Sequence, residues 1–521
     1  MAASKKNLKV SLDALVVREA FEIQEEHSQN ISSYIPMISI RDLEPNSFFC
    51  PFLRKPDFQR ETNEWDAEKI CEFIESFLDG DLIPAIILWR SSSSYYFVVD
   101  GSHRLSSLIA WINDDYGDGK ISKEFYDGDI TEEQKVAAKD TRKLIKAKIG
   151  AYKAYQSFAS NQTKLDTKML ERAKNLGASG ISLQWVEGDA RKAEDSFFKI
   201  NQKAAPIGET EIRLIQARKT PNGVAARAIM RSGSGHKYWS DFSEDKQEQI
   251  EEIAQEINQL IFQPKLSNPI KTLDVPIVAN LSPSEKLELI LGFVNVANSI
   301  TDEEASQDST GEQTIKFLNR CRKIAQRINS IHPSSLGLHP IIYFYTRLGR
   351  AKIGSFYGIV SLILYLEEKK SFSEFVTVRK DFEWVIWEYD MIPQLVRSSG
   401  ALGAREKVRN FYLEIIEKLS SGVAKKNVIK EIASEKKFGA LKISSKKETT
   451  NTQGKKFSRE TKAAAFIREA MRGCPKCKIC GGYLPSRFNS IDHIKRKADG
   501  GLGTLDNAQL THPYCNTTYK N

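Results

Sequence analysis

The side chains best suited to chemistry gather in the last part of this chain, residues 474–521. Cys477 and Cys480 form a pair with a two-residue gap, and His512 and Cys515 form a second pair with the same gap. Two such pairs can supply the four thiolate and imidazole ligands of a closed tetrahedral zinc site. A segment this short buries little apolar surface, so the sequence predicts a structural zinc ion that staples it.

Cys474 offers an alternative ligand, because Cys474 and Cys477 also form a C-x-x-C pair. We favour Cys477 with Cys480, since Gly481 and Gly482 follow directly and permit the tight turn of a zinc knuckle. Cys474 then lies outside the ligand set.

Acid, imidazole and amide side chains lie between and after these pairs. Asp492 and His493 are adjacent, and Asn507 follows a Gly-Gly turn. Asn516 comes directly after the last cysteine. A neutral imidazole can take a proton near pH 7, and a hard cation on oxygen ligands stabilises phosphoryl charge. These types therefore suit metal-assisted hydrolysis of a phosphodiester.

The order of these residues resembles the HNH (ββα-metal) nuclease family. The resemblance implies that His493 is the general base and that Asn507 orients it. It also implies that Asp492 and Asn516 hold one divalent cation, Mg²⁺ or Mn²⁺. The alternative is a zinc knuckle without catalysis, but such a knuckle does not require these four residues at these places.

A second polar group lies on a predicted strand-to-helix turn, residues 100–104. The apolar runs 85–89 and 95–99 predict two buried strands, and residues 105–112 predict a helix. A glycine in the turn permits close backbone approach, the helix N-terminus favours an anion, and Arg104 adds a fork of donors. The sequence thus predicts a phosphate-binding turn. The alternative is a structural turn in which Arg104 makes only a salt bridge.

This stretch resembles the ParB/sulfiredoxin-like domain of GmrSD-type modification-dependent restriction enzymes. One family landmark is a Gln-Arg pair before a tryptophan, which in this chain is Gln59-Arg60 before Trp65. The other is a D-G-Q-x-R turn, which in this chain is D-G-S-H-R at residues 100–104. The resemblance implies a nucleoside triphosphate, such as ATP or GTP, as the ligand. Ser102 stands where glutamine is common, so the motif supports phosphate binding better than hydrolysis. The binding residues that the resemblance implies are Gln59, Arg60, Asp100, Gly101, His103 and Arg104.

A later stretch resembles a further landmark of that family, with Phe197 and Phe198 leading to Asn201 and then to Arg213. Asn201 and Arg213 fit capping and surface roles equally well. We therefore leave this landmark out of the predicted site.

The helices and strands expected around these residues indicate an α+β multidomain protein. Its parts are an N-terminal ParB-like α/β domain, an all-α middle domain and a small zinc-stapled ββα-metal domain at the C-terminus. Apolar residues at helical spacing predict helices across residues 240–421, with their aromatic residues in the core. The predicted segments are an extension with one helix (1–37), the ParB-like sensor with helical insertions (38–235), the helical domain (236–421), a basic linker (422–461) and the nuclease (462–521).

The positive charge of the chain is concentrated at its C-terminal end. Residues 424–521 hold 21 Lys and Arg against 8 Asp and Glu, a net charge of +13, which leaves −4 of the total +9 for residues 1–423. A cationic end on a slightly acidic body favours binding of a polyanion such as double-stranded DNA. The alternative is a solvated linker.

Composition and patterning exclude several protein classes. No apolar run reaches the roughly 18 residues of a membrane span, and the first residues lack the apolar core of a signal peptide. Cys50, Cys71 and Cys321 are scattered and fit no disulfide framework. The sequence therefore predicts a cytoplasmic protein with no membrane partner.

Together these features predict a metal-dependent HNH DNA endonuclease controlled by an N-terminal domain that binds nucleotide or senses DNA modification. Bacterial defence against phage, with modified phage DNA as a substrate, is the role the resemblance implies. One HNH site cuts one strand, so double-strand cutting would require a homo-oligomer or repeated nicking. Two alternatives remain: a nucleotide-gated DNA-binding regulator whose zinc module does not cut, and an enzyme that is primarily an NTPase.

Overall fold

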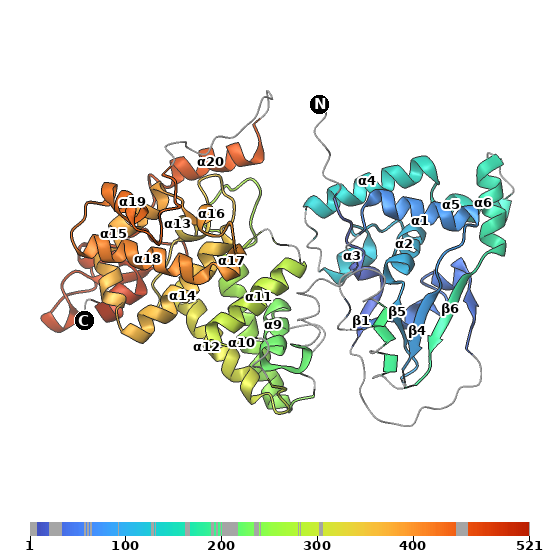
Figure 1. Ribbon diagram of the computed structural model, residues 1–521, viewed down its shortest axis with the longest axis horizontal. Coiled ribbons are helices and arrows are strands. Elements are labelled where there is room, and N and C mark those ends of the chain that lie inside the picture. Colours follow the sequence, from blue (N-terminus) through green and yellow to red (C-terminus); the bar gives the residue numbers. More distant parts are fainter. Residues whose placement is uncertain are drawn as a thin grey trace. The chain divides into compact units, whose positions relative to one another are not determined.

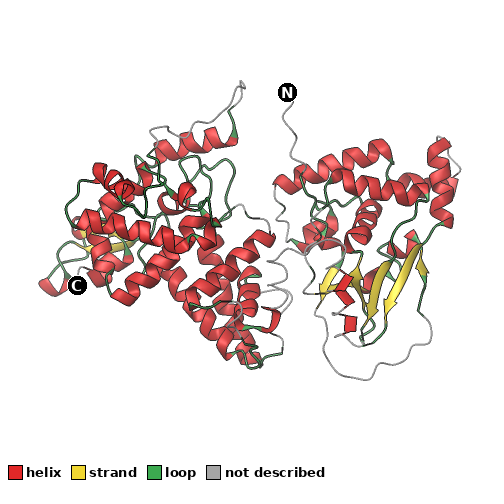
Figure 2. Cartoon of the chain, in the orientation of Figure 1, coloured by secondary structure: helices red, strands yellow, loops and turns green. Residues whose placement is uncertain are grey.

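The computed structural model consists of two compact units, Met1–Gln216 and Ala217–Asn521. The first combines a sheet with helices and the second is mainly helical (Figures 1 and 2). This agrees with the predicted fold class; the finer segment boundaries stay predictions. The residues that the structure describes are 8–19, 34–56, 59, 62, 65–91, 93–126, 130, 132–161, 167–188, 192–193, 196–197, 199–200, 217–233, 239, 241–279, 281, 283–301, 306–443 and 457–519.

The first unit is built on a six-stranded mixed sheet with the order β1-β3-β5-β4-β6-β2. Pairs β1/β3, β3/β5 and β4/β6 are parallel, whereas β4/β5 and β2/β6 are antiparallel. The strands are β1 (Val17–Glu19), β2 (Met37–Ile38), β3 (Leu53–Pro56), β4 (Ile86–Arg90), β5 (Tyr96–Asp100) and β6 (Ile181–Val186).

The central strands are apolar on both faces because both faces are covered. Leu88 and Val98 belong to the main core of the unit, on the helical face. Their neighbours Trp89 and Phe97 belong to a smaller cluster with Phe197. Since successive side chains of a strand point to opposite faces, a continuous apolar run is expected here rather than an alternating one. The predicted strands match β4 and β5 to within one residue.

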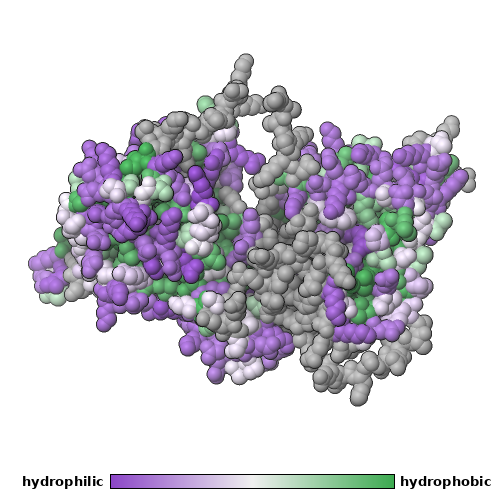
Figure 3. Space-filling view, viewed as in Figure 1, coloured by the Kyte–Doolittle hydropathy of each residue, from purple (hydrophilic) through white to green (hydrophobic). Residues whose placement is uncertain are grey.

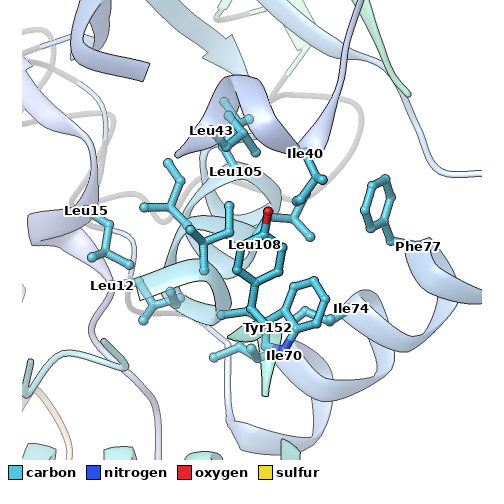
Figure 4. Close-up of a cluster of buried hydrophobic side chains, with 14 of the residues drawn as sticks. Leu12, Leu15, Ile40, Leu43, Ile70, Ile74, Phe77, Leu105, Leu108 and Tyr152 are labelled. Atoms are coloured by element: carbon cyan, nitrogen blue, oxygen red, sulfur yellow. The ribbon is translucent and has the colours of Figure 1, made fainter. Parts of the chain in front are cut away.

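The helices of this unit cover one face of the sheet (Figure 1). Figure 4 shows how side chains from α1, α2 and the N-terminal segment meet in the main core, among them Ile74, Leu108 and Leu12. Arg172 of α6 donates to Asp79 of α1 at 2.5 Å, which fastens the outer helix. The helices are α1 (Ala67–Asp79), α2 (Ser102–Asn113), α3 (Lys120–Phe125), α4 (Glu132–Lys148), α5 (Tyr152–Asn161) and α6 (Thr167–Ala178).

The described part of the N-terminal extension is not the helix that its sequence predicts. Residues 8–19 form a single 3₁₀ turn, Asp13–Leu15, followed by β1. Val10 N–H donates to Trp65 O and Leu12 N–H donates to Thr62 O, both at 2.8 Å. These backbone bonds to the core sheet domain outweigh the weak helical pattern of so short a segment.

The second unit is a helical body that carries a small hairpin. The predicted aromatic core is confirmed for Tyr343, Phe344, Tyr345 and Phe382, which are buried. Trp384 and Trp387, which were predicted in the same core, are only partly buried. The helices are α9 (Pro221–Met230), α10 (Glu244–Phe262), α11 (Pro283–Asn298), α12 (Glu312–Ile328), α13 (Pro340–Phe344), α14 (Ile353–Lys369), α15 (Phe372–Glu388), α16 (Ile392–Leu395), α17 (Gly400–Gly403), α18 (Arg405–Ser420), α19 (Lys425–Ser434) and α20 (Arg459–Ala470).

Part of the predicted basic linker packs onto this body. Helix α19 buries Val428, Ile429 and Ile432, and it lies against α15 and α18. Residues 444–456 of the predicted linker lie outside the described residues. After α20, the chain forms the antiparallel hairpin β7 (Ser490–His493) and β8 (Ala508–Thr511).

The outer surface is mixed in polarity. On the face shown in Figure 3, hydrophilic residues predominate on the surface of each unit, with smaller apolar areas among them. Among the described residues, no helix has both the length and the apolar character needed to cross a membrane.

Candidate functional site

The four predicted zinc ligands come together at the base of the C-terminal hairpin. The ligand atoms of Cys477, Cys480, His512 and Cys515 all lie within 4.8 Å of one another. His512 Nδ1 lies 3.3 Å from Cys480 Sγ and 3.8 Å from Cys515 Sγ. Three thiols and one imidazole nitrogen at this spacing are the donor set of a structural zinc site, and the cluster could hold Zn²⁺ in that way.

The other ring nitrogen of His512 supports this arrangement. His512 Nε2–H donates to the carbonyl oxygen of Tyr483 at 3.0 Å, because a carbonyl can only accept. The lone pair of Nδ1 is therefore directed at the three sulfurs. Metal-bound histidines commonly have their second nitrogen held by a carbonyl or carboxylate in this way.

Cys474 stays outside the cluster. Its thiol donates to Leu484 O at 3.6 Å, and burial raises its pKa to about 11. The knuckle turn instead uses Gly481, whose φ is +71°, and Gly481 N–H donates to Cys477 O at 2.9 Å. The preference for the pair Cys477 and Cys480 agrees with this geometry.

The hairpin above the cluster carries the predicted catalytic pair. Asp492 faces Gln509 and His493 faces Ala508 across the antiparallel ladder. Asp492 is buried, and its Oδ2 accepts from Gln509 Nε2 at 2.7 Å. His493 is half-buried at the end of β7. The strand therefore brings a carboxylate and an imidazole to one edge of the hairpin.

Asn516 lies against the same strand. Its Nδ2 donates to Ser490 Oγ at 2.7 Å and to Ile491 O at 3.3 Å. Because the amide nitrogen is directed at β7, the amide oxygen is the atom suited to a cation. Carboxylate and amide oxygens are ligands that a hard divalent ion prefers, so the donor types of Asp492 and Asn516 suit the predicted cation, and their binding of it stays a prediction.

Asn507 closes the loop that follows His493. Its Oδ1 accepts from Lys495 N at 2.7 Å, and its Nδ2 donates to Leu502 O at 2.7 Å and to Lys495 O at 3.1 Å. Gly501 leaves space for the Asn507 side chain, since a Cβ at position 501 would lie 2.9 Å from Asn507 Nδ2. Asn507 thus fixes the backbone on the C-terminal side of His493.

A separate pocket lies in the first unit, at the end of β5. Its volume is about 160 Å³. Five of the six residues predicted there line it, and Arg60 lies outside the described residues. Three further lining residues were not predicted as part of the site, although Trp65 and Phe197 had served as family landmarks. The lining residues are Gln59, Trp65, Asp100, Gly101, Ser102, His103, Arg104 and Phe197.

The floor of the pocket is the strand-to-helix turn. Gly101 has φ +100°, and a Cβ there would lie 2.4 Å from Ile86 Cδ1, so the position requires glycine. Arg104 donates to Asp100 Oδ2 at 2.5 Å and to Pro84 O at 2.6 Å. These bonds fix the guanidinium beside the N-terminus of α2. The predicted salt bridge and the predicted phosphate-binding fork are therefore compatible.

An unsatisfied polar atom marks the opposite wall. Gln59 is 7% exposed, and its side-chain oxygen has no hydrogen-bond partner among the residues that the structure describes. Leaving a buried acceptor unpaired costs roughly 1–3 kcal/mol, so a ligand that donates to it would recover that energy. His103 adds an aromatic surface, because its ring stacks on Trp65 with centroids 5.5 Å apart.

A buried ion cluster from the N-terminal segment holds this wall. Lys55 is fully buried, and its Nζ donates to Asp13 Oδ1 at 2.5 Å and to Thr62 Oγ1 at 3.2 Å. Arg18 donates to Asp13 Oδ1 at 3.1 Å and also to Gln59 O. Burial alone would raise the pKa of Asp13, but the charges of Lys55 and Arg18 outweigh burial and lower it. No local spacing of residues indicates this cluster.

The first unit has a mixed sheet with a polar pocket at a strand-to-helix turn, and the second unit is a helical body with a C-terminal hairpin and a Cys₃His cluster. Comparison with protein families identifies a domain toward each end of the chain. Residues 41–217 match the family described as GmrSD restriction endonuclease, N-terminal domain, and residues 477–521 match the HNH endonuclease family. No curated protein and no solved structure gives a match. The chain therefore joins a GmrSD-type N-terminal domain to a C-terminal HNH endonuclease domain, and its class implies DNA as the substrate.

Proposed function

We propose that this chain is a metal-dependent DNA endonuclease that hydrolyses phosphodiesters at the β7–β8 hairpin. The observation that carries the proposal is the position of Asp492 and His493 at the end of β7, with Asn516 held against that strand. A zinc knuckle without catalysis would not need this arrangement. Lys495, Arg496 and Lys497, which come after Ile494, are exposed and suit contact with a DNA backbone.

Each residue of the hairpin then has a role. His493 accepts the proton of the attacking water, and Asn507 fixes the loop that positions it. Asp492 and Asn516 would hold Mg²⁺ or Mn²⁺, and that ion, when bound, stabilises charge on the phosphoryl and leaving oxygens. The Cys₃His cluster holds the start of the final helical turn and so fixes Asn516 relative to β7.

The direct test is nicking of plasmid DNA with Mg²⁺ or Mn²⁺. Wild type should cut, and His493→Ala should lose about 10²- to 10⁴-fold in rate, the usual contribution of a general base. His332→Ala, an exposed histidine of the same unit, is the matched control and should cut as wild type. An inert wild type under every condition, or a fully active His493→Ala, would refute the proposal.

We further propose that the pocket of the first unit binds the phosphates of a nucleoside triphosphate such as ATP or GTP. The helix N-terminus, the fixed Arg104 and the unpaired oxygen of Gln59 support it. The remaining predicted residues, Arg60, Asp100, Gly101 and His103, would complete the binding set. Bound nucleotide, a DNA modification, or both would then control the nuclease.

The pocket is best tested by direct nucleotide binding. Gln59→Leu should lose affinity for ATP or GTP while its melting temperature stays level or rises, because it removes an unsatisfied buried acceptor. Gln156→Leu, which changes an exposed glutamine of the same unit, is the control. If Gln59→Leu binds ATP or GTP with unchanged affinity, Gln59 does not contact the nucleotide.

The biological role we propose is restriction of phage DNA. Cleavage assays across unmodified, methylated, glucosylated and phosphorothioated DNA, with and without ATP and GTP, would identify the trigger. Retarded DNA migration without cleavage, unaffected by Asp492→Ala, would indicate a DNA-binding regulator instead. Phosphate release that disappears in Arg104→Ala and dominates over cleavage would indicate an NTPase.

A further inference from the structure

The zinc knuckle lies directly on helix α15 of the helical body. Gly482 of the knuckle packs so closely that a Cβ there would lie 2.7 Å from Arg379 Nε. Gly337, whose carbonyl accepts from Arg379, is similarly close, since its Cβ would lie 2.9 Å from the His512 ring. Tyr514 N–H also donates to Ser335 O at 2.9 Å. The knuckle therefore contacts the body through α15 and through the segment before α13.

One acid of α15 reaches the metal cluster through a single residue. Glu383 Oε2 accepts from the backbone N–H of Tyr483 at 2.7 Å. The carbonyl of the same Tyr483 accepts from His512 Nε2 at 3.0 Å. The route from Glu383 to a zinc ligand thus consists of two hydrogen bonds across one peptide residue.

Glu383 is itself rigidly held. Its side chain is 1% exposed, and Oε1 accepts from Arg379 Nε at 2.7 Å and from Tyr343 OH at 2.9 Å. Arg379 is fully buried and donates to Leu336 O at 2.5 Å and to Gly337 O at 3.0 Å. The network therefore links α13, α15 and the segment before α13 to the knuckle.

A buried ion pair contributes little net stability compared with apolar packing, so stability alone does not account for its presence here. What distinguishes this ion pair is that it fixes the orientation of the Glu383 carboxylate. Each oxygen of Glu383 has a fixed donor, and the result is a fixed position for the backbone N–H of Tyr483. The carbonyl of the same residue, on the other side of its Cα, accepts from His512 Nε2 and so helps to set the orientation of the His512 ring.

We propose that Glu383, a residue of the helical body, is an outer-shell positioning residue of the Cys₃His zinc site. The inference rests on the proposed zinc occupancy of that cluster. It extends the metal site beyond the C-terminal nuclease segment, because the acid lies about one hundred residues earlier in the chain, as the numbering of Glu383 and Tyr483 shows. The knuckle and the helical body then form one metal-linked unit.

The test is retention of zinc by the purified full-length protein. Glu383→Gln keeps the shape of the side chain but replaces one acceptor oxygen with an NH₂ donor. That donor then faces either Tyr483 N–H or Arg379 Nε–H, and one hydrogen bond is lost. Removal of such an outer-shell partner typically lowers metal affinity about 10- to 100-fold. We expect zinc to transfer to a competing chelator correspondingly faster, and a cobalt-substituted sample to show a shifted visible spectrum.

Glu388→Gln is the matched control, because Glu388 lies on the same helix and pairs with Arg347 at the surface. It should retain zinc as wild type does. Tyr343→Phe is the milder second variant, since it removes one donor to Glu383 and leaves the charge in place. Its zinc transfer should lie between wild type and Glu383→Gln, and this variant decides the question if Glu383→Gln does not fold.

Equal zinc transfer in wild type, Glu388→Gln and Tyr343→Phe, together with a folded Glu383→Gln that retains zinc normally, would overturn the inference. Zinc content and the cobalt spectrum are measured without DNA. A wild-type protein that binds zinc but never cuts would refute the proposed nuclease and leave this inference standing, whereas a protein that cuts without zinc would refute the inference alone.

Discussion

The pocket of the first unit and the hairpin of the second are built in opposite ways. The hairpin and its Cys₃His cluster come from one short stretch, whereas the acid that hydrogen-bonds the knuckle, Glu383, is distant in the chain. The pocket is lined by residues spread from Gln59 to Phe197. The comparison shows that a contiguous motif can still depend on remote residues for its geometry, and that a dispersed site can be fixed by a local turn.

The largest expected effect is loss of the metal cluster. Cys515→Ser should lose stoichiometric zinc and all cleavage, because structural zinc contributes on the order of 10 kcal/mol of apparent binding energy to folding. Metal analysis and circular dichroism check this. Cys474→Ser is the control, since Cys474 lies outside the cluster and a serine can donate to Leu484 O as well. Loss of zinc from Cys474→Ser would contradict the assigned ligand set.

The next effect concerns the buried ions that hold the pocket wall. Asp13→Asn should destabilise the first unit by about 3–5 kcal/mol at neutral pH, since it leaves the buried Lys55 without its counter-charge. Urea unfolding followed by tryptophan fluorescence measures this. Asp81→Asn, at an exposed position, should have little effect.

The loss of stability in Asp13→Asn should depend on pH in a defined direction. The pKa of Asp13 is lowered in the folded state, so its stabilisation is complete above the unfolded pKa of about 3.9. It is lost as the pH falls further, toward the folded pKa. The difference between wild type and Asp13→Asn should therefore shrink below about pH 4. A constant difference across that window would mean that packing, not charge, is responsible.

A smaller effect is expected at the turn that floors the pocket. Gly101→Ala forces a side chain into a positive-φ position against Ile86, which should cost about 1–3 kcal/mol and weaken nucleotide binding. Gly177→Ala in α6 is the control, because a Cβ there meets nothing within 4 Å. That control should be neutral or stabilising by about 0.5–1 kcal/mol. Thermal unfolding of both variants tests the contrast.

The smallest effect belongs to a surface contact between the hairpin segment and the body. Arg487 pairs with Asp274 at 2.8 Å, with side chains 39% and 32% exposed. Solvent screens such a pair, so Arg487→Ala should change stability by less than about 1 kcal/mol and leave zinc in place. A loss as large as that of Asp13→Asn would show that this exposed contact, rather than the buried Glu383 network, fixes the knuckle on the body.

The sequence predicted what depends on local spacing and missed what depends on the path of the chain. Cys477, Cys480, His512 and Cys515 could be paired because their spacing is diagnostic, and the turn at residues 100–104 could be placed between a strand and a helix. Asp13 could not be paired with Lys55, because no periodicity connects an N-terminal turn to a distant strand.

Glu383 was missed for a related reason. An arginine and a glutamate four residues apart on a helix ordinarily indicate a solvated surface pair. Only the enclosing aromatic residues and the knuckle, which arrive from elsewhere in the chain, make this pair a buried one. Helix α19 was underestimated likewise, since its three buried apolar residues are too few to outweigh its lysines in a sequence pattern.

The close fit of Gly482 against Arg379 has a practical consequence for protein engineering. A chimera that borrows only the final sixty or so residues as a cutting cassette would expose the glycine-lined underside of the knuckle to water, with Tyr483 left without its acid. A workable graft would carry α13 and α15 along, and the donor segment would then be several times longer than the family motif suggests.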